Sequence, residues 1–323
     1  MTLEYKEDIA MSYTTRFIGI DVSKSALDVC VLPDRHNLRF ANTEPGIADL
    51  IARIRTYPGL ERIVLEPTGG YERMLVRALQ AAQLPVSKVN ALLVRHFAKA
   101  SGTLSKTDRI DAFVLADYGQ RMSPRLMIKT DDARHELTDL VARRRQLTHM
   151  LIQEKNRLEK PDNPARTLIE QSISFLKHQK QEVENLMRQC IDASPVLTAI
   201  LQVLLSQKGV GFVTACVLIA ELPEIGLLEK GQIAKLVGVA PINRDSGMFQ
   251  GKRMIGGGRR EVRNALYYAA LPAIRFDPGL RDFYKRLTEN GKPSKVAVIA
   301  VVRKMVTILN ARMRDHYALI LDG

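Results

Sequence analysis

The chain has 323 residues, which is long enough for two domains of ordinary size. Apolar residues make up 46% of it and charged residues 26%, a balance that supports folded cores and excludes a wholly disordered chain. The formal net charge is +13, which favours a polyanionic partner.

The positive charge is uneven along the chain. Between Lys252 and Lys304, thirteen Lys and Arg residues stand against four acids, a surplus of nine in one sixth of the chain. Such a stretch fits a solvated helix face as well as a surface that binds nucleic-acid phosphates, and charge alone leaves both interpretations open.

Membrane and secreted proteins are disfavoured by the same sequence. The longest apolar runs, residues 213–220 and 296–302, are well short of the roughly 20 residues that cross a bilayer, so we expect no membrane span. The N-terminus is acidic and lacks a signal-peptide pattern, which predicts a cytoplasmic protein. The cysteines Cys30, Cys190 and Cys216 are far apart, which predicts buried thiols rather than disulfides or a zinc site.

The first part of the chain has the pattern of an α/β domain. After a polar leader over residues 1–15, short apolar runs bounded by turn residues predict strands, and apolar periods of three to four predict helices. Over residues 16–125 we expect strands at 17–22, 26–32 and 38–41, a helix at 45–57, a strand at 62–66, a helix at 71–82, a strand at 86–89, and helices at 91–100 and 107–120.

The remainder is predicted to be mainly helical. Residues 131–160 form a long charged helix with leucines at near-heptad spacing, and a proline-rich break separates it from a second helix at 165–190. We interpret 131–192 as a helical hairpin, which fits a solvent-exposed structural pair or a coiled-coil subunit contact. Residues 195–323 form a third region, with helices expected at 259–274 and 294–312.

A glycine turn lies inside this third region. Residues 201–222 show an apolar helix, the turn Lys208-Gly209-Val210-Gly211 and a second apolar helix, the pattern of a helix-hairpin-helix unit. Such a turn presents backbone N–H groups to a phosphate, which makes Gly209 and Gly211 candidate nucleic-acid contacts. Tight interhelix turns also favour glycine for packing alone.

Four acids of the first domain form the chemically informative pattern. Asp21 and Glu66 each end an apolar strand, where a side chain can project from the sheet into a cleft. Asp108 and Asp111 are three residues apart on a predicted helix and therefore share one face. Oxygen ligands of this kind suit Mg²⁺, or alternatively Mn²⁺, and phosphoryl transfer. Taken singly, each acid also fits a helix N-terminus, a strand end or a solvated surface position.

Several motifs identify a family resemblance. The strings IGIDVSK at residues 18–24, LEPTGGY at 65–71 and KTDRIDA at 106–112 resemble the DEDD transposases of the IS110 insertion-sequence family, relatives of the pilin-gene invertases. The resemblance continues in GVAP at 238–241, DSG at 245–247, RNALY at 263–267 and NGK at 290–292. It therefore covers nearly the whole chain.

The resemblance implies a fold and a chemistry. It implies a RuvC-like, RNase H-type N-terminal domain, a coiled-coil connector, and a mainly α-helical C-terminal transposase domain whose nucleophile, by motif match, is Ser246. It also implies a bacterial DNA recombinase that works through a 5′-phosphoserine intermediate on donor and target DNA, guided by a non-coding bridge RNA. Without the resemblance, Asp-Ser-Gly is a common turn tripeptide.

Basic residues near Ser246 become candidate phosphate contacts on this interpretation. The candidate contacts are Arg244, Lys252, Arg253, Arg259 and Arg260.

Cutting several strands in concert also requires more than one subunit, so we expect a dimer or tetramer, associated with the nucleoid while it acts.

Two rival functions remain open at this point. A RuvC-like, structure-specific DNA nuclease would use the four acids to activate water and leave Ser246 as a turn residue. A nucleic-acid-binding scaffold would use the acids structurally, but it leaves their order along the chain unexplained. Metal dependence separates the scaffold from an enzyme, and a covalent protein–DNA adduct separates the recombinase from the nuclease.

Overall fold

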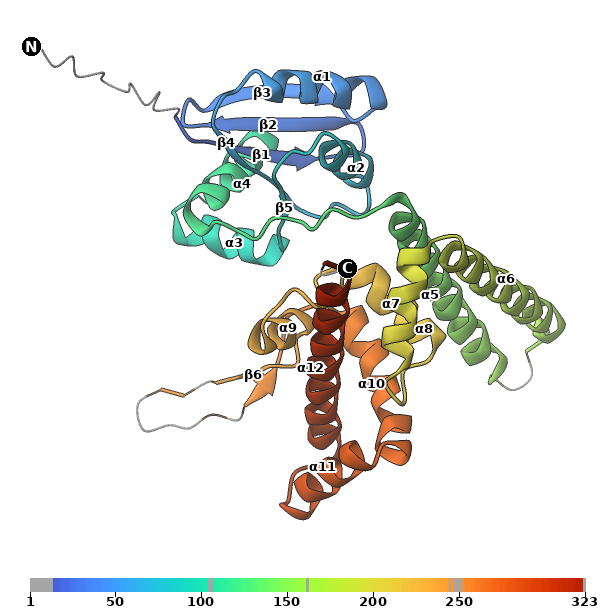
Figure 1. Cartoon of the computed structure of the whole chain (residues 1–323). Coiled ribbons are helices and arrows are strands. Elements are labelled where there is room, and N and C mark those ends of the chain that lie inside the picture. The colour runs from blue at the N-terminus through green and yellow to red at the C-terminus, as the bar shows by residue number, and fades with distance from the viewer. Residues whose placement is uncertain are drawn as a thin grey trace, which may run out of the picture. The chain divides into compact units, whose positions relative to one another are not determined.

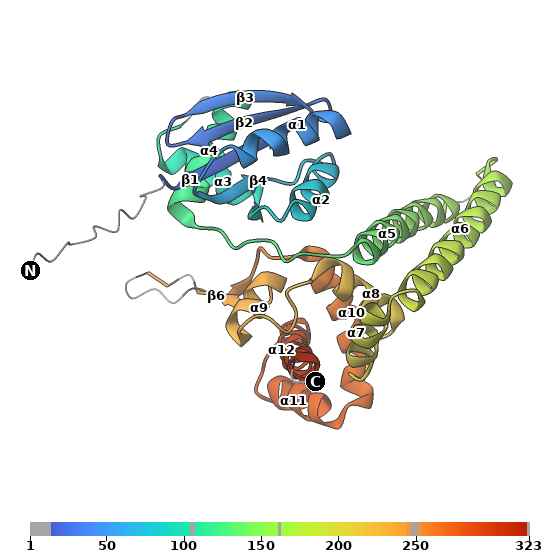
Figure 2. The same cartoon turned by 45° about the horizontal axis from the view of Figure 1, so that its top comes forward.

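The computed structural model describes residues 14–103, 107–160, 163–243, 245–246, 251 and 253–321. Apart from its last two residues, the polar leader expected over 1–15 lies outside the described residues. The chain divides into two compact units, one ending at Lys129 and the other beginning at Thr130. Figures 1 and 2 show the helices and strands of each unit.

Unit 1 is built on a mixed five-stranded sheet. Its strands are β1 (Arg16–Val22), β2 (Ala26–Leu32), β3 (His36–Ala41), β4 (Leu60–Leu65) and β5 (Val86–Lys88). The strand order is β3-β2-β1-β4-β5. The first three strands form an antiparallel meander, whereas β4 and β5 run parallel to β1. β1 therefore lies at the centre of the sheet.

Helices cover both faces of this sheet. They are α1 (Glu44–Arg55), α2 (Arg73–Ala81), α3 (Ala91–Ala100) and α4 (Asp108–Met122). Because successive strand residues alternate between faces, Ile18, Ile20 and Val22 pack with α1 and α2 on one side. Val64 packs with α3 and α4 on the other side. Phe17, Gly19 and Asp21 alternate with the first set and so belong to the α4 face.

α4 approaches β1 so closely that Gly19 has no room for a side chain. A Cβ added at Gly19 would lie 2.0 Å from the backbone oxygen of Ala112 and 2.4 Å from the backbone nitrogen of Ala116. Both neighbours are small and belong to α4, so the helix lies directly on the central strand. This contact fixes the distance between α4 and β1.

Gly19→Ala is expected to lower the free energy of unfolding of unit 1 by about 3 kcal/mol, because the clash is with backbone that cannot rotate away. Urea denaturation measures this. Gly231→Ala is the matched control, since Gly231 is helical and a Cβ there meets nothing within 4 Å. A Gly19→Ala protein as stable as the wild type would contradict the described packing of α4.

Unit 2 is helical with one short hairpin. Its helices are α5 (Asp132–Leu158), α6 (Arg166–Asp192), α7 (Pro195–Leu205), α8 (Phe212–Glu221), α9 (Lys230–Val237), α10 (Arg260–Phe276), α11 (Pro278–Glu289) and α12 (Ser294–Leu321). The strands β6 (Pro241–Ile242) and β7 (Met254–Ile255) pair in antiparallel fashion. α9, α11 and the hairpin were not predicted from the sequence.

The predicted helical hairpin is present as α5 and α6, which Figure 2 shows side by side. Its base is part of the main core of unit 2, because Leu137 and Val141 of α5 and Met187 of α6 are buried together with residues of α7 to α12. Nε of Arg144 in α5 lies 2.7 Å from Oε1 of Glu184 in α6, an ion pair between the two helices. The helical hairpin is therefore joined at its base to the helical core of unit 2.

The predicted α/β start and helical remainder are confirmed. All three cysteines are buried and free, as expected, and burial raises the pKa of Cys30 to about 11. In the part of the chain that the structure describes, no helix is long and apolar enough to cross a membrane.

Candidate active site

Three acids of unit 1 share one end of one sheet face. Asp21 lies directly opposite Asp28 in the β1–β2 register, so their side chains point to the same face. Ile20 pairs with Leu65 on the other side of β1, which places Glu66, the next residue, level with Asp21. Asp21 is half-buried, whereas Asp28 is only 5% exposed.

α4 brings the remaining two acids to the same place. Thr107 caps the helix, its Oγ1 accepting the N–H of Ile110 at 3.3 Å, so that Asp108 and Asp111 fall in the first turn. Ala112 lies on Gly19, and Asp21 follows Gly19 by two residues on the same face. The first turn of α4 therefore lies toward Asp21.

The charges of these acids act on one another. Burial and, in decreasing order, the charges of Asp111, Asp108, Glu66 and Asp28 raise the pKa of Asp21 from 3.8 to about 6. The effect requires all four neighbours to lie within electrostatic reach of Asp21. Unit 1 therefore concentrates negative charge at one point of the α4 face.

This acidic cluster is not a closed set of metal ligands. Among the residues that the structure describes, no group of three or more His, Cys, Asp or Glu side chains is placed to hold a metal ion. Carboxylate oxygens remain the donors that Mg²⁺ and Mn²⁺ prefer, and like charges in one place are neutralised by a cation. The donor chemistry fits a divalent cation, although the side chains are not closed around one.

A buried acid orders the loop after Glu66. Oε2 of Glu72 accepts the N–H of Thr68 at 3.1 Å and that of Gly70 at 3.0 Å, and Glu72 is only 5% exposed. Asn42 donates to the backbone oxygens of Ser23 and Tyr71 and so ties this loop to the chain after β1. Neither role was predicted from the sequence.

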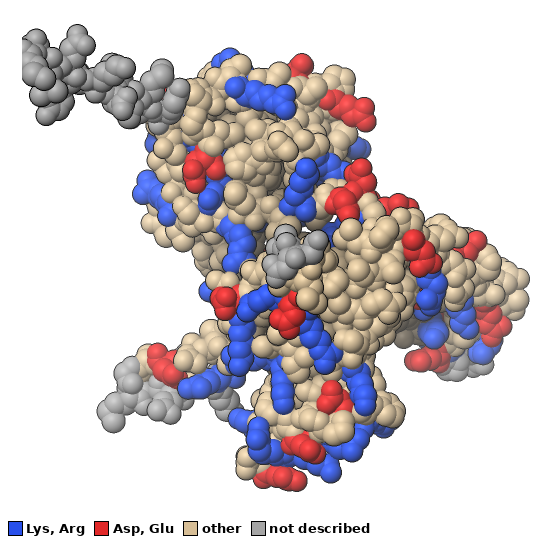
Figure 3. All heavy atoms as spheres, viewed as in Figure 1, with Lys and Arg blue, Asp and Glu red and all other residues tan. Residues whose placement is uncertain are grey.

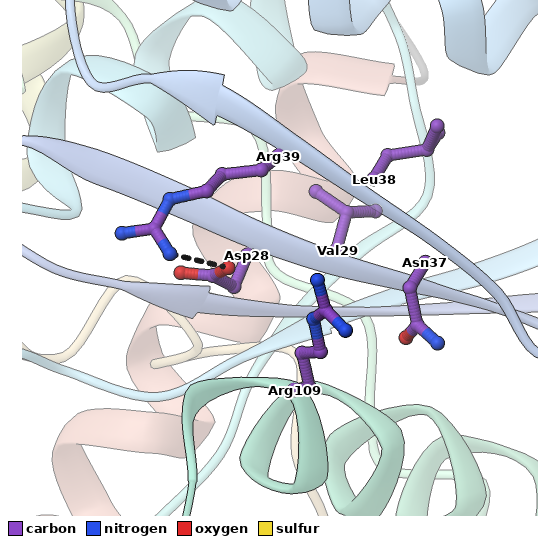
Figure 4. A pocket seen from close by; sticks show the side chains of 6 residues that line it. All are labelled: Asp28, Val29, Asn37, Leu38, Arg39 and Arg109. Atoms are coloured by element: carbon purple, nitrogen blue, oxygen red, sulfur yellow. Dashed lines mark ion pairs between the residues drawn. The ribbon is translucent and has the colours of Figure 1, made fainter.

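Asp28 was also missed, and it forms part of a polar hollow beside the cluster. Oδ1 of Asp28 lies 3.5 Å from Nη1 of Arg39, its cross-strand partner on β3. Figure 4 shows Arg109 of α4 reaching toward the same strands, where it lines the hollow with Arg39 and Asn37. Two guanidinium groups thus stand next to the acids on the same face of the sheet.

Arg109→Gln is expected to weaken the binding of DNA by about 10-fold and to reduce the salt dependence of binding by about one charge. Its guanidinium lines the hollow that also contains Asp28, one of the acids on this face of the sheet. Fluorescence anisotropy over a salt series measures both effects. Arg55→Gln, at an exposed position of α1, is the control for loss of one charge. Identical salt slopes for Arg109→Gln and the wild type would contradict the role.

Ser246 lies in the other unit, between the strands of the β6–β7 hairpin. Its side chain is exposed. Its neighbour Asp245 accepts the N–H of Gly251 at 3.1 Å, which links the two sides of the hairpin loop. Because the side chain is exposed, its hydroxyl is accessible to a large substrate.

The candidate phosphate contacts differ in what surrounds them. Gly209, with φ +94°, packs against α10, where a Cβ would lie 2.4 Å from the oxygen of Ala269, so packing accounts for this glycine. Gly211 is exposed at the start of α8 with no neighbour within 4 Å of a Cβ. Nη1 and Nη2 of Arg259 donate to the two carboxylate oxygens of Glu224. Arg253 and Arg260 are exposed, and Arg244 and Lys252 lie outside the described residues.

Positive charge is concentrated on part of unit 2. Figure 3 shows Lys and Arg side chains in rows over α11 and α12, with several Asp and Glu side chains among them at the α11 end. The C-terminal surplus counted in the sequence is thus displayed on a surface. A polyanion such as nucleic acid suits this surface by charge.

Comparisons with known proteins agree with these features. A family model for DEDD transposases of the IS110 type, described as "Transposase", matches residues 18–161, and a model described as "Transposase IS116/IS110/IS902 family" matches residues 201–285. The pilin gene-inverting proteins of Moraxella lacunata and Moraxella bovis are each 28% identical over 93% of this chain and 96% of theirs.

A third relative is similar over a shorter stretch. The uncharacterized 42 kDa protein of insertion element IS900 from Mycobacterium paratuberculosis is 34% identical over 36% of this chain and 30% of its own. The two family models cover both units, and the matched range of the first contains all four acids of the DEDD pattern. The chain belongs to the IS110 family of transposases and is a DNA transposase or recombinase.

Proposed function

We propose that this transposase cuts and rejoins DNA through a covalent 5′-phosphoserine intermediate on Ser246, with Asp21, Glu66, Asp108 and Asp111 holding a divalent cation. The observation that carries the proposal is the placement of these acids, because the β1–β4 register puts Glu66 level with Asp21, and the first turn of α4, which contains Asp108 and Asp111, lies toward Asp21. The charges of the other three acids act on Asp21, although the four residues come from three separate chain segments. A nucleic-acid-binding scaffold does not require such an arrangement.

The fold assignment inferred from the resemblance is part of the proposal. We assign residues 16–125 to a RuvC-like, RNase H-type domain, 131–192 to a coiled-coil connector and 195–323 to the transposase domain. The strand order β3-β2-β1-β4-β5 with a central β1, and the antiparallel packing of α5 and α6, support these assignments.

The four acids would hold Mg²⁺, or alternatively Mn²⁺, through carboxylate oxygens. When bound, the cation would neutralise charge that develops on the attacked phosphate and favour loss of a proton from the attacking hydroxyl. The acids themselves must then be ionised. The local repulsion that raises the pKa of Asp21 works against this in the protein without metal.

The serine chemistry conserves the energy of the phosphodiester bond. The Ser246 hydroxyl loses its proton, its oxygen attacks the scissile phosphorus, and the 3′ oxygen leaves and takes up a proton. The DNA 5′ phosphate is then esterified to Ser246. A 3′ hydroxyl of another strand attacks this ester, and the serine oxygen leaves and regains a proton, so strands are rejoined without ATP.

The partners follow from this chemistry. Donor and target DNA supply the strands, and we propose that a bridge RNA specifies them, as the family resemblance implies. Two duplexes and several concerted cuts require a dimer or tetramer. The nearly full-length similarity to pilin gene-inverting proteins supports rejoining, because an inversion by name ends with joined DNA.

The test is a trapped adduct. Purified protein is incubated with Mg²⁺, the element's junction DNA and its flanking non-coding RNA, and the products are resolved under denaturing conditions. The proposal predicts a protein–DNA band that disappears when EDTA is added or the RNA is omitted. Cleaved DNA that is free of protein at every time point would instead support the hydrolytic nuclease.

A further inference from the structure

The hairpin that carries Ser246 is held at its base by one arginine of α10. Gly238 precedes β6, and Gly257 follows β7, so these glycines mark the two ends of the hairpin. Nη1 of Arg263 donates to the backbone oxygen of Gly257 at 2.7 Å and to that of Gly238 at 3.3 Å. One guanidinium nitrogen thus bridges both ends.

The two ends touch backbone to backbone at this point. A Cβ on Gly258 would lie 2.3 Å from the nitrogen of Gly238, and a Cβ on Gly238 would lie 2.3 Å from the oxygen of Gly257 and 2.4 Å from Nη1 of Arg263. Gly238 and Gly258 also have φ values of +78° and +66°, which favour glycine. Only glycines leave the space that the Arg263 side chain enters.

Arg263 projects from a part of α10 that is itself anchored. The N–H of Arg259 donates to the backbone oxygen of Leu236 at 2.8 Å, and its guanidinium binds Glu224 and the backbone oxygen of Glu221. Nη1 of Arg145 in α5 lies 3.7 Å from Oε2 of Glu261 in α10. The start of α10 is therefore fixed to α5, α8 and α9.

The hairpin itself is small, and the chain before β6 is also bound to α9, where the N–H groups of Val239 and Ala240 donate to the backbone oxygen of Ala234. β6 and β7 are two residues each, and all four of these residues are exposed or partly exposed. A two-stranded hairpin of this size is marginally stable in water, so its direction depends on its base. Arg263 supplies a link between that base and the rigid body of unit 2.

We propose that Arg263 is a positioning residue, which clamps the base of the hairpin and thereby aims Ser246 for attack on the phosphate. The inference rests on the proposed function of Ser246 and adds a residue to it. Arg263 forms hydrogen bonds with backbone oxygens instead of a carboxylate in the described residues, which fits a clamp. A misplaced nucleophile reacts slowly although its substrate still binds.

The test compares rate with binding in full-length protein. At saturating DNA and RNA, Arg263→Ala is expected to form the serine adduct about 100-fold more slowly, while the DNA concentration that gives half the maximal rate stays within about 2-fold. Arg263→Lys is expected to recover part of the rate, because an ammonium group has donors for both carbonyl oxygens. Arg55→Ala, at an exposed position of α1 outside the basic stretch, is the control for loss of one arginine and should react like the wild type.

A covalent clamp provides the rescue. Ile242 and Met254 are cross-strand partners in the hairpin and are both exposed, so Ile242→Cys with Met254→Cys can form a disulfide close to the lost contact. The native cysteines are buried and do not compete. In the Arg263→Ala background, oxidation is expected to restore the rate to within about 5-fold of the wild type, and reduction to remove the gain.

The outcomes separate the two proposals. Absence of any wild-type adduct overturns the proposed function. A wild-type adduct that forms equally fast in Arg263→Ala overturns the clamp alone. A slow Arg263→Ala protein that the oxidised disulfide does not rescue, or that has lost DNA affinity in proportion to its rate, also overturns the clamp. If Arg263→Ala unfolds by circular dichroism at the assay temperature, Arg263→Lys carries the same comparison.

Discussion

Ser246→Ala is expected to abolish the covalent protein–DNA adduct, with a loss of at least about 10³-fold in its rate of formation, because alanine has no nucleophilic oxygen. The exposed side chain of Ser246 allows this change without loss of packing. DNA affinity, measured by fluorescence anisotropy, should stay within about 2-fold of the wild type, since one hydroxyl contributes little beside many phosphate contacts.

Ser172→Ala is the matched control, because Ser172 is an exposed serine of α6, bonded only to a backbone oxygen of its own helix. It should form the adduct at the wild-type rate. If Ser246→Ala still released cleaved DNA as fast as the wild type, the serine mechanism would be wrong, and metal-activated water would become the nucleophile.

Asp21→Asn is expected to abolish strand cleavage, by at least about 10³-fold, while raising the melting temperature of the metal-free protein by a few degrees. The folded-state pKa of Asp21, about 6, lies above its ordinary value of 3.8. The ionised carboxylate therefore destabilises the fold above about pH 6, and this effect disappears below about pH 4. Asparagine keeps the shape and removes the charge.

The melting temperatures of Asp21→Asn and the wild type in EDTA should therefore differ at pH 8 and converge as the pH falls toward 4. Differential scanning fluorimetry measures this, with Asp49→Asn on the exposed side of α1 as the control for loss of one acid. A less stable Asp21→Asn protein at pH 8 in EDTA would show that Asp21 makes a stabilising contact and would contradict the description of a repulsive cluster.

Local patterns in the sequence predict unit 1 well. The strand at 26–32 and the helix at 91–100 have the bounds that the sequence predicts, because apolar runs and breaker residues mark both ends. β3 begins two residues earlier than expected, directly after Arg35, whose φ of +53° forms the turn. The sequence does not show that Arg35, which has a bulky side chain, adopts this left-handed conformation.

The β6–β7 hairpin depends on contacts that local patterns do not contain. Gly238 and Gly258 meet across twenty residues, and Arg263 joins the same point from α10, so the glycines between them resemble an ordinary loop. α11 is different, because Leu280, Phe283, Tyr284 and Leu287 follow the spacing of an amphipathic helix, so this helix could have been predicted from the sequence. The hairpin comes from tertiary packing.

The acidic cluster was accessible from sequence only in part. Strand ends and an i, i+3 pair single out four acids, but Asp28 lies inside an apolar strand, and only the β1–β2 register places it opposite Asp21. A lone acid in an apolar strand was the available signal. The pairing of Arg259, a candidate phosphate contact, with Glu224 could not be predicted either, because the two residues lie 35 positions apart in the chain.

The phosphoserine intermediate is tested most directly by mass spectrometry of the trapped adduct after digestion by nuclease and protease. The serine mechanism predicts a peptide that spans Ser246 and carries a nucleotide through a phosphate ester on that serine, obtained only when Mg²⁺ was present. A nucleotide on any other residue, or adduct-free peptides from a reaction that has cleaved its DNA, would contradict it.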